Sequence, residues 1–181
     1  MSRYLKIYLR DQLALGVLWR DLARRSARNN RGTDLGRALD DVATGIAEDV
    51  DTFTDMMRRL HVAPNPLKTR ATAVAERLGR LKLNGQLRGY SPLSRFFELD
   101  ALVMGIEGKK TLWTTLSTHG GLGALLPDVD FDELVRRATA QRAALEPFHA
   151  ACAADAFRPA PAGPGGGKAD FTLDIGRTDP S

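Results

Sequence analysis

Residues 33–60 read TDLGRALDDVATGIAEDVDTFTDMMRRL, and this stretch decides the fold. Its apolar residues recur at spacings of three, four and seven, which place them on one face of an α-helix. Thr33 stands just before the pattern and is a typical N-cap residue. The apolar face consists of Leu35, Leu39, Val42, Ile46, Phe53, Met57 and Leu60. The stretch therefore predicts a long amphipathic helix with one buried face.

Three more segments show the same helical periodicity. One runs from about residue 2 to residue 29. Another begins at Ser91-Pro92, a hydroxyl cap followed by proline in the first turn. The last begins at Asp130, which has Glu133 at capping-box spacing. Their apolar faces are predicted to be Tyr4, Tyr8, Leu15, Trp19 and Leu22; Phe96, Leu99, Val103, Ile106, Trp113 and Leu116; and Leu134, Ala138, Leu145, Phe148 and Cys152.

The connections between these helices indicate how they are arranged. Residues 30–32 form a tight turn, so the first two helices should make an antiparallel hairpin. Residues 61–90 form a long crossover that should contain a short basic amphipathic helix, and the glycines before Pro127 form a turn between the last two helices. Two helical hairpins joined by one long crossover have ferritin-like connectivity. We predict an all-α four-helix bundle over residues 1–158.

The C-terminal residues 159–181 differ in character from the rest. They begin with PAPAGPGGGK, a glycine- and proline-rich linker that cannot bury enough apolar surface to fold. We expect this tail to be disordered in the free protein.

Composition limits the class of protein. The 181 residues include 26 Lys and Arg against 22 Asp and Glu, a formal net charge of +4, and 43% are apolar. These values are those of a soluble globular protein, and no apolar stretch is long enough to span a membrane. Residues 1–10 lack the apolar core of a signal peptide, and the single Cys152 fits a reducing compartment. We therefore expect a cytoplasmic protein with no membrane partner.

Basic residues concentrate in the crossover, where they could form a patch for nucleic acid. No aromatic residues are interleaved with them, and the acidic helix over residues 33–60 is an available partner within the chain. We favour a solvated basic face and do not expect a nucleic-acid partner. The residues concerned are Lys68, Arg70, Arg77, Arg80, Lys82 and Arg88.

A ferritin-like bundle raises the question of a di-metal site, which needs Glu-x-x-His on two of the four helices and Glu on the others. Glu146 and His149 match that motif in the last helix. The helix over residues 33–60 offers only Glu48 and Asp51, both on its water-facing side. The sequence therefore predicts no complete metal site and no cofactor, with iron bound near Glu146 and His149 as the alternative.

Several polar residues fall on or beside the apolar faces, where an unpaired charge would be costly. We interpret them as a structural polar layer that fixes the register of the helices. The alternative is a catalytic or metal-binding layer that uses the two aspartates with Glu98 or Glu107. The predicted layer consists of Asp11, Asp49, Lys109, Lys110 and Gln141.

The segments YLRDQLALGVLWRDLARR (8–25) and GTDLGRALDDVATGIAEDVDTF (32–53), with the crossover and the second hairpin, resemble the ferritin-like superfamily. The pattern is most similar to its YciF-like branch of bacterial stress-associated proteins. The resemblance covers residues 1–158 and implies a four-helix bundle. The chain departs from the family at Glu48-x-x-Asp51, where the family has Glu-x-x-His, so that only Glu146 and His149 match a ligand pair.

The tail carries a second resemblance. Its linker ends in a short apolar segment, and this arrangement is similar to the peptides that tether cargo inside encapsulin shells. The resemblance implies docking through Phe171, Leu173, Ile175 and Gly176.

These observations predict a non-enzymatic stress-associated or interaction protein, acting as a homo-oligomer through its exposed helix faces. Two alternatives remain open at this point. One is a di-iron carboxylate protein that oxidises or stores iron, and the other is an encapsulin cargo docked by its C-terminal peptide.

Overall fold

The computed structural model describes residues 1–64 and 90–159. This part of the chain is all-helical, as the periodicity predicts, and contains no strand. Its helices are α1 (Arg3–Asn29), α2 (Asp34–Arg59), α4 (Pro92–Thr118), α5 (Leu122–Leu125) and α6 (Phe131–Ala156). The helix expected in the crossover and the proposed docking residues Phe171, Leu173, Ile175 and Gly176 lie outside the described residues.

The beginnings of three long helices confirm the capping residues expected from the sequence. Thr33, Ser91 and Asp130 precede α2, α4 and α6. Each side chain accepts a hydrogen bond from the backbone N–H three residues later, at 3.0, 3.1 and 2.8 Å respectively. These bonds satisfy donors that a helix start would otherwise leave unpaired.

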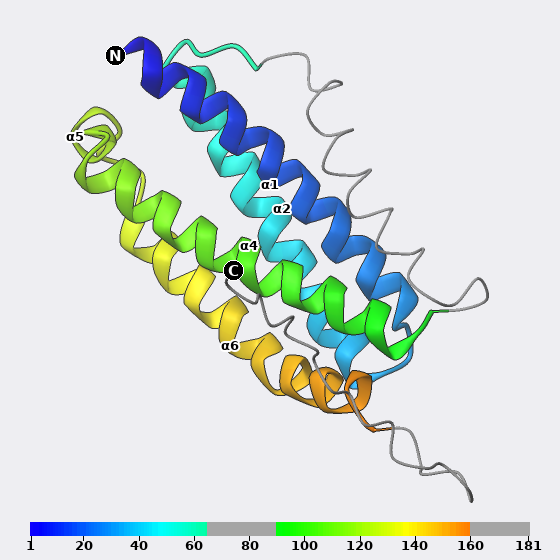
Figure 1. Ribbon diagram of the computed structural model, residues 1–181. Helices are drawn as coiled ribbons and strands as arrows, with labels where there is room; N and C mark the ends of the chain where they lie inside the picture. Colours follow the sequence, from blue (N-terminus) through cyan, green and yellow to red (C-terminus); the bar gives the residue numbers. More distant parts are fainter. Residues whose placement is uncertain (65–89, 160–181) are drawn as a thin grey trace, which may run out of the picture.

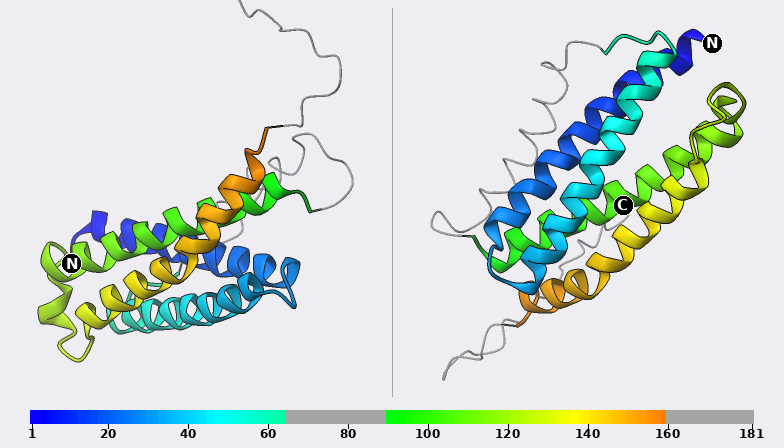
Figure 2. Two further views of the ribbon diagram at one scale, coloured as in Figure 1. Left: turned by 90° about the horizontal axis from the view of Figure 1, so that it is seen from below. Right: turned by 180° about the vertical axis from the view of Figure 1, so that it is seen from behind.

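The four long helices form two antiparallel hairpins that pack against each other (Figure 1). One hairpin is α1 with α2, and the other is α4 with α6. Between the hairpins, α1 contacts α4 and α2 contacts α6, an arrangement that Figure 2 shows from two further directions. The turn from α1 to α2 is tight because Gly32 adopts a φ of 83°, which strongly favours glycine.

The core lies between the hairpins. Trp113 of α4 is 1% exposed and packs its ring against Phe53 of α2, with ring centroids 5.6 Å apart, and against Phe131 of α6 at 6.4 Å. Aromatic pairs at these separations are favourable beyond their buried area. Three helices are thereby held together at one point.

The apolar face predicted for α2 is buried as expected, apart from the half-buried Leu60 at its end. The prediction for α1 was wrong at its start, because Tyr4 is 82% exposed. The buried face of α1 includes Leu9, Leu13 and Leu22, so it is rotated from the aromatic residues used to place it. Tyrosine has an apolar ring and a polar tip, so it marks a core face less reliably than leucine.

Within residues 1–64 and 90–159, no helix combines the length and apolar character needed to cross a membrane.

Candidate functional site

A cluster of charged and polar side chains lies inside the helical assembly, and we call it the Asp49 cluster. It comprises Asp49 of α2, Lys109 of α4, and Arg137 and Gln141 of α6. Lys109 donates hydrogen bonds to Asp49 Oδ2 and to Gln141 Oε1. Arg137 donates to the other oxygen, Asp49 Oδ1, and lies 3.3 Å from Glu48 Oε2 at the surface. Each carboxylate oxygen of Asp49 therefore contacts a cation.

The helical sequence explains why this cluster is buried. Asp49 lies between Ile46 and Phe53 on α2 and is only 3% exposed. Gly45 lies one turn before it, and a Cβ at that position would collide with the amide nitrogen of Gln141. The absence of a side chain at Gly45 lets Gln141 of α6 come close to α2 and reach Lys109.

Burial controls the electrostatics of the cluster. The pKa of Lys109 is lowered from its ordinary value, chiefly because burial disfavours the charged ammonium, while Asp49 acts in the opposite direction. Asp49, Lys109 and Arg137 together carry one net positive charge when all are ionised. Glu48, on the exposed side of Arg137, offsets that charge only through a contact open to solvent.

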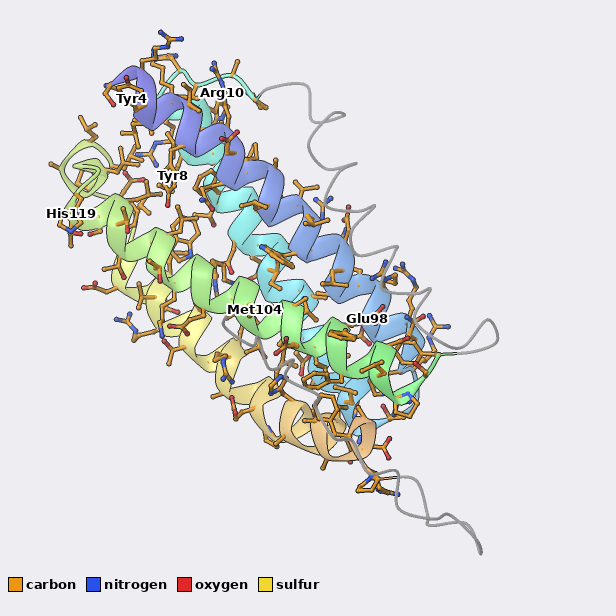
Figure 3. All side chains as sticks on the ribbon, viewed as in Figure 1. Tyr4, Tyr8, Arg10, Glu98, Met104 and His119 are labelled. Atoms are coloured by element: carbon orange, nitrogen blue, oxygen red, sulfur yellow. The ribbon has the colours of Figure 1, made fainter. Side chains whose placement is uncertain are left out.

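A cavity of about 250 Å³ lies beside the cluster, between α1, α2 and α4. Asp49 and Lys109 form part of its wall, and most of the remaining lining is apolar. Met104, which lies midway along α4 (Figure 3), is 61% exposed. It lines the cavity, as does the exposed Gly108. The other lining residues are Gln12, Leu13, Leu15, Gly16, Trp19, Ile46, Val50, Phe53, Gly105, Ile106, Leu112 and Trp113.

The structure brings together three of the five residues assigned to the polar layer: Asp49, Lys109 and Gln141. Lys110 is not part of the cluster, because its Nζ lies 2.5 Å from Oε1 of Glu107, one turn earlier on the outer side of α4. Asp11 is half-buried on α1, outside the residues that line the cavity.

Glu146 and His149, the predicted metal pair, have separate partners. Glu146 is exposed and forms an ion pair with Arg142 on α6. His149 Nε2 lies 3.0 Å from Asp100 Oδ1 of α4, and its ring centroid is 5.3 Å from that of Phe96. Among the residues that the structure describes, no group of three or more His, Cys, Asp or Glu side chains is placed to hold a metal ion.

A second buried polar cluster surrounds Glu98 near the start of α4 (Figure 3). Ser26 Oγ and Tyr90 Oη donate hydrogen bonds to Glu98 Oε2 at 2.8 and 2.9 Å, and Arg25 Nε lies 3.1 Å from Oε1. Asn30 in turn donates to the Tyr90 oxygen at 3.0 Å. Burial raises the pKa of Tyr90 well above its ordinary value, so the phenol stays protonated as a donor.

Sequence reasoning missed Arg137 and most of the Glu98 cluster. A signal for Ser26 was present, because it lies three and four positions after Ala23 and Leu22 on the buried face of α1. Arg137 lies one turn before Gln141, and so on the same side of α6. Tyr90 precedes α4 and has no helical phase that could have placed it.

Comparison of the chain with protein-family models, curated proteins and solved structures gave no match. A functional proposal for this chain therefore depends on the contacts described above. The Asp49 cluster, with the cavity beside it, is the most distinctive of them.

Proposed function

We propose that this chain is a non-enzymatic interaction protein built on a ferritin-like four-helix bundle. In this proposal, the Asp49 cluster stands in the interior where a member of that superfamily would hold two metal ions. The two hairpins, and the long stretch of chain between α2 and α4, support the architecture. The observation that carries the non-enzymatic part of the proposal is the pairing of Asp49 with two cations, because it occupies both oxygens that a metal ion would need.

The chemistry of Asp49 favours a structural role over metal binding. A carboxylate binds a metal ion through its oxygens, but both oxygens of Asp49 already accept bonds from Lys109 and Arg137. A metal ion beside Asp49 would also be repelled by the ammonium of Lys109. The cluster instead fixes α2 against α4 and α6, because any other register would leave a buried charge unpaired.

The exposed apolar side chains support a role in association. Met1, Tyr4 and Ile7 are exposed at the start of α1, and Leu125 is 59% exposed on α5. The start of α1 and α5 lie at the same end of the molecule (Figures 1 and 2). Large apolar side chains gathered at one end of a molecule are candidates for a protein–protein contact. We therefore place the self-association surface at this end.

Sedimentation velocity over a range of concentrations tests this surface. We expect the wild-type chain to sediment above its monomer mass of 19.8 kDa and the variant Tyr4→Asp/Leu125→Asp to sediment as a monomer. Met104→Asp is the matched control, because Met104 at 61% is about as exposed as Leu125 but lies midway along α4 (Figure 3). A wild-type chain that is monomeric at every concentration would refute self-association.

The two alternatives gain no support from the described residues. Glu146 pairs with Arg142 and His149 with Asp100, so the described residues do not bring the two together as the di-iron alternative requires. Docking of the tail to an encapsulin shell stays a prediction, since residues 160–181 are outside the described part of the chain.

A further inference from the structure

The proposed self-association does not use the cavity between α1, α2 and α4. Its walls are mostly apolar, and they come from Leu13 and Trp19 of α1, Ile46 and Phe53 of α2, and Leu112 of α4. At one place the wall is charged, where Lys109 and Asp49 reach the cavity. We propose that this cavity binds a free medium-chain carboxylic acid, with the acyl chain against the apolar walls and the carboxylate at Lys109.

The hydrogen bonds of Lys109 indicate why the ligand carries an acceptor. A lysine ammonium has three N–H donors. Among the described residues, Lys109 donates to Asp49 and to Gln141. One donor is therefore left for an acceptor in the cavity that Lys109 lines.

The charge balance indicates that this acceptor is anionic. Asp49 is shared between Lys109 and Arg137, and the other anion on Arg137, Glu48, is 59% exposed and screened by solvent, so the buried part of the cluster holds two cations against one anion. A ligand carboxylate would neutralise the remaining charge, whereas an amine would add to it. The chemistry of the site thus favours an acid over an alcohol or an amine with the same chain.

The size of the cavity limits the chain. Engineered apolar cavities of roughly 150 Å³ bind benzene. At about 250 Å³, and with exposed residues in its wall, this cavity suits an acyl chain of about eight to ten carbons. The acyl chains of a phospholipid are esterified and have no free carboxylate to offer Lys109, which distinguishes a free acid from a membrane lipid.

Both tryptophans of the chain, Trp19 and Trp113, line the cavity and provide the readout. The probe is decanoate with a terminal bromine, which quenches tryptophan fluorescence on contact. It is titrated into the full-length protein below the concentration at which the acid aggregates. We expect saturable quenching, and weaker binding of the alcohol with the same brominated chain.

Three variants distinguish binding at this site from nonspecific binding of the probe to apolar surface. Lys109→Met removes the ammonium and should weaken binding of the acid by about ten- to a hundredfold, the value of a charged hydrogen bond, and binding of the alcohol, a neutral acceptor, by a smaller factor. Lys110→Met is the matched control, because Lys110 pairs with Glu107 outside the cavity, and it should bind as the wild type does. Gly108→Leu, at an exposed position with open space around its Cβ, should obstruct the cavity and weaken both probes.

The proposal is overturned if quenching does not saturate, or if the acid binds no more tightly than the alcohol. It is also overturned if Lys109→Met and Lys110→Met bind the acid equally well. If Lys109→Met does not fold, Gly108→Leu decides: unchanged binding of the acid by that variant contradicts the site. Sedimentation velocity of Gly108→Leu tests whether a second copy of the chain covers the cavity instead. Loss of a dimer together with unchanged binding of the acid would show that it does.

Discussion

Replacing Asp49 with alanine removes the carboxylate that Lys109 and Arg137 share. Asp49 is 3% exposed, and the side chains of Lys109 and Arg137 are 13% and 26% exposed. Removing one partner of a buried ion pair costs about 3–5 kcal/mol, because the other charge is left uncompensated. Arg137 can still pair with Glu48 and reach water, so only the ammonium of Lys109 loses its charged partner. We therefore expect a loss of about 3 kcal/mol in the free energy of unfolding.

Urea denaturation followed by far-ultraviolet circular dichroism measures this loss. The double variant Asp49→Ala/Lys109→Met should be more stable than Asp49→Ala, since it also removes the stranded ammonium. Arg37→Gln is the control: its ion pair with Asp34 is exposed on both sides, so the change should stay below about 1 kcal/mol. The reasoning is refuted if Asp49→Ala costs no more than Arg37→Gln, or if Lys109→Met added to Asp49→Ala destabilises the chain further.

Three more predictions concern the helices around the cavity. Gly105→Ala should destabilise the protein by about 1–3 kcal/mol, because its Cβ would lie 2.7 Å from the Trp19 ring. Gly108→Ala should stabilise it by about 0.5–1 kcal/mol, because that Cβ meets nothing within 4 Å and alanine favours the helix; urea denaturation of both variants shows whether the signs are opposite. Wild-type stability relative to Lys109→Met should rise from neutral pH towards 10.5, the ordinary pKa of lysine. Burial lowers the pKa of Lys109 in the folded state, so in that range the unfolded chain binds more protons than the folded chain. The free energy of unfolding therefore rises as the pH rises. Thermal melts of both proteins at about pH 7 and about pH 10 test this direction. A melting-temperature difference between wild type and Lys109→Met that falls with rising pH contradicts it.

The helices could be predicted from sequence because their signals are local. The side chains of Thr33, Ser91 and Asp130 each accept a hydrogen bond from the backbone N–H three residues later. Such caps can be recognised from the sequence alone. The buried face of α2 was also legible, since aliphatic residues and methionines define it. The face of α1 was not, because Tyr4 counted as apolar although its ring projects into solvent.

The Asp49 cluster could be predicted only in part, because helical phase gives the direction of a side chain too coarsely. Helical phase placed Asp49 and Gln141 on the buried side, but it could not choose between Lys109 and Lys110. These neighbours point about 100° apart on the helix, and a long side chain can turn either way from the edge of a face. Arg137 reaches Asp49 from a position that is itself half-buried, so phase alone does not select it.

We propose that ion pairs occupy the interior position that a di-metal centre takes in a ferritin-like bundle, and iron loading tests this proposal most directly. The full-length protein is incubated with ferrous iron in air, desalted, and measured for iron per chain by elemental analysis. We predict iron at the level of a protein without a site, because Lys109 and Arg137 already hold the carboxylate of Asp49. A content of about two iron ions per chain, the occupancy of a di-iron bundle, would contradict the account.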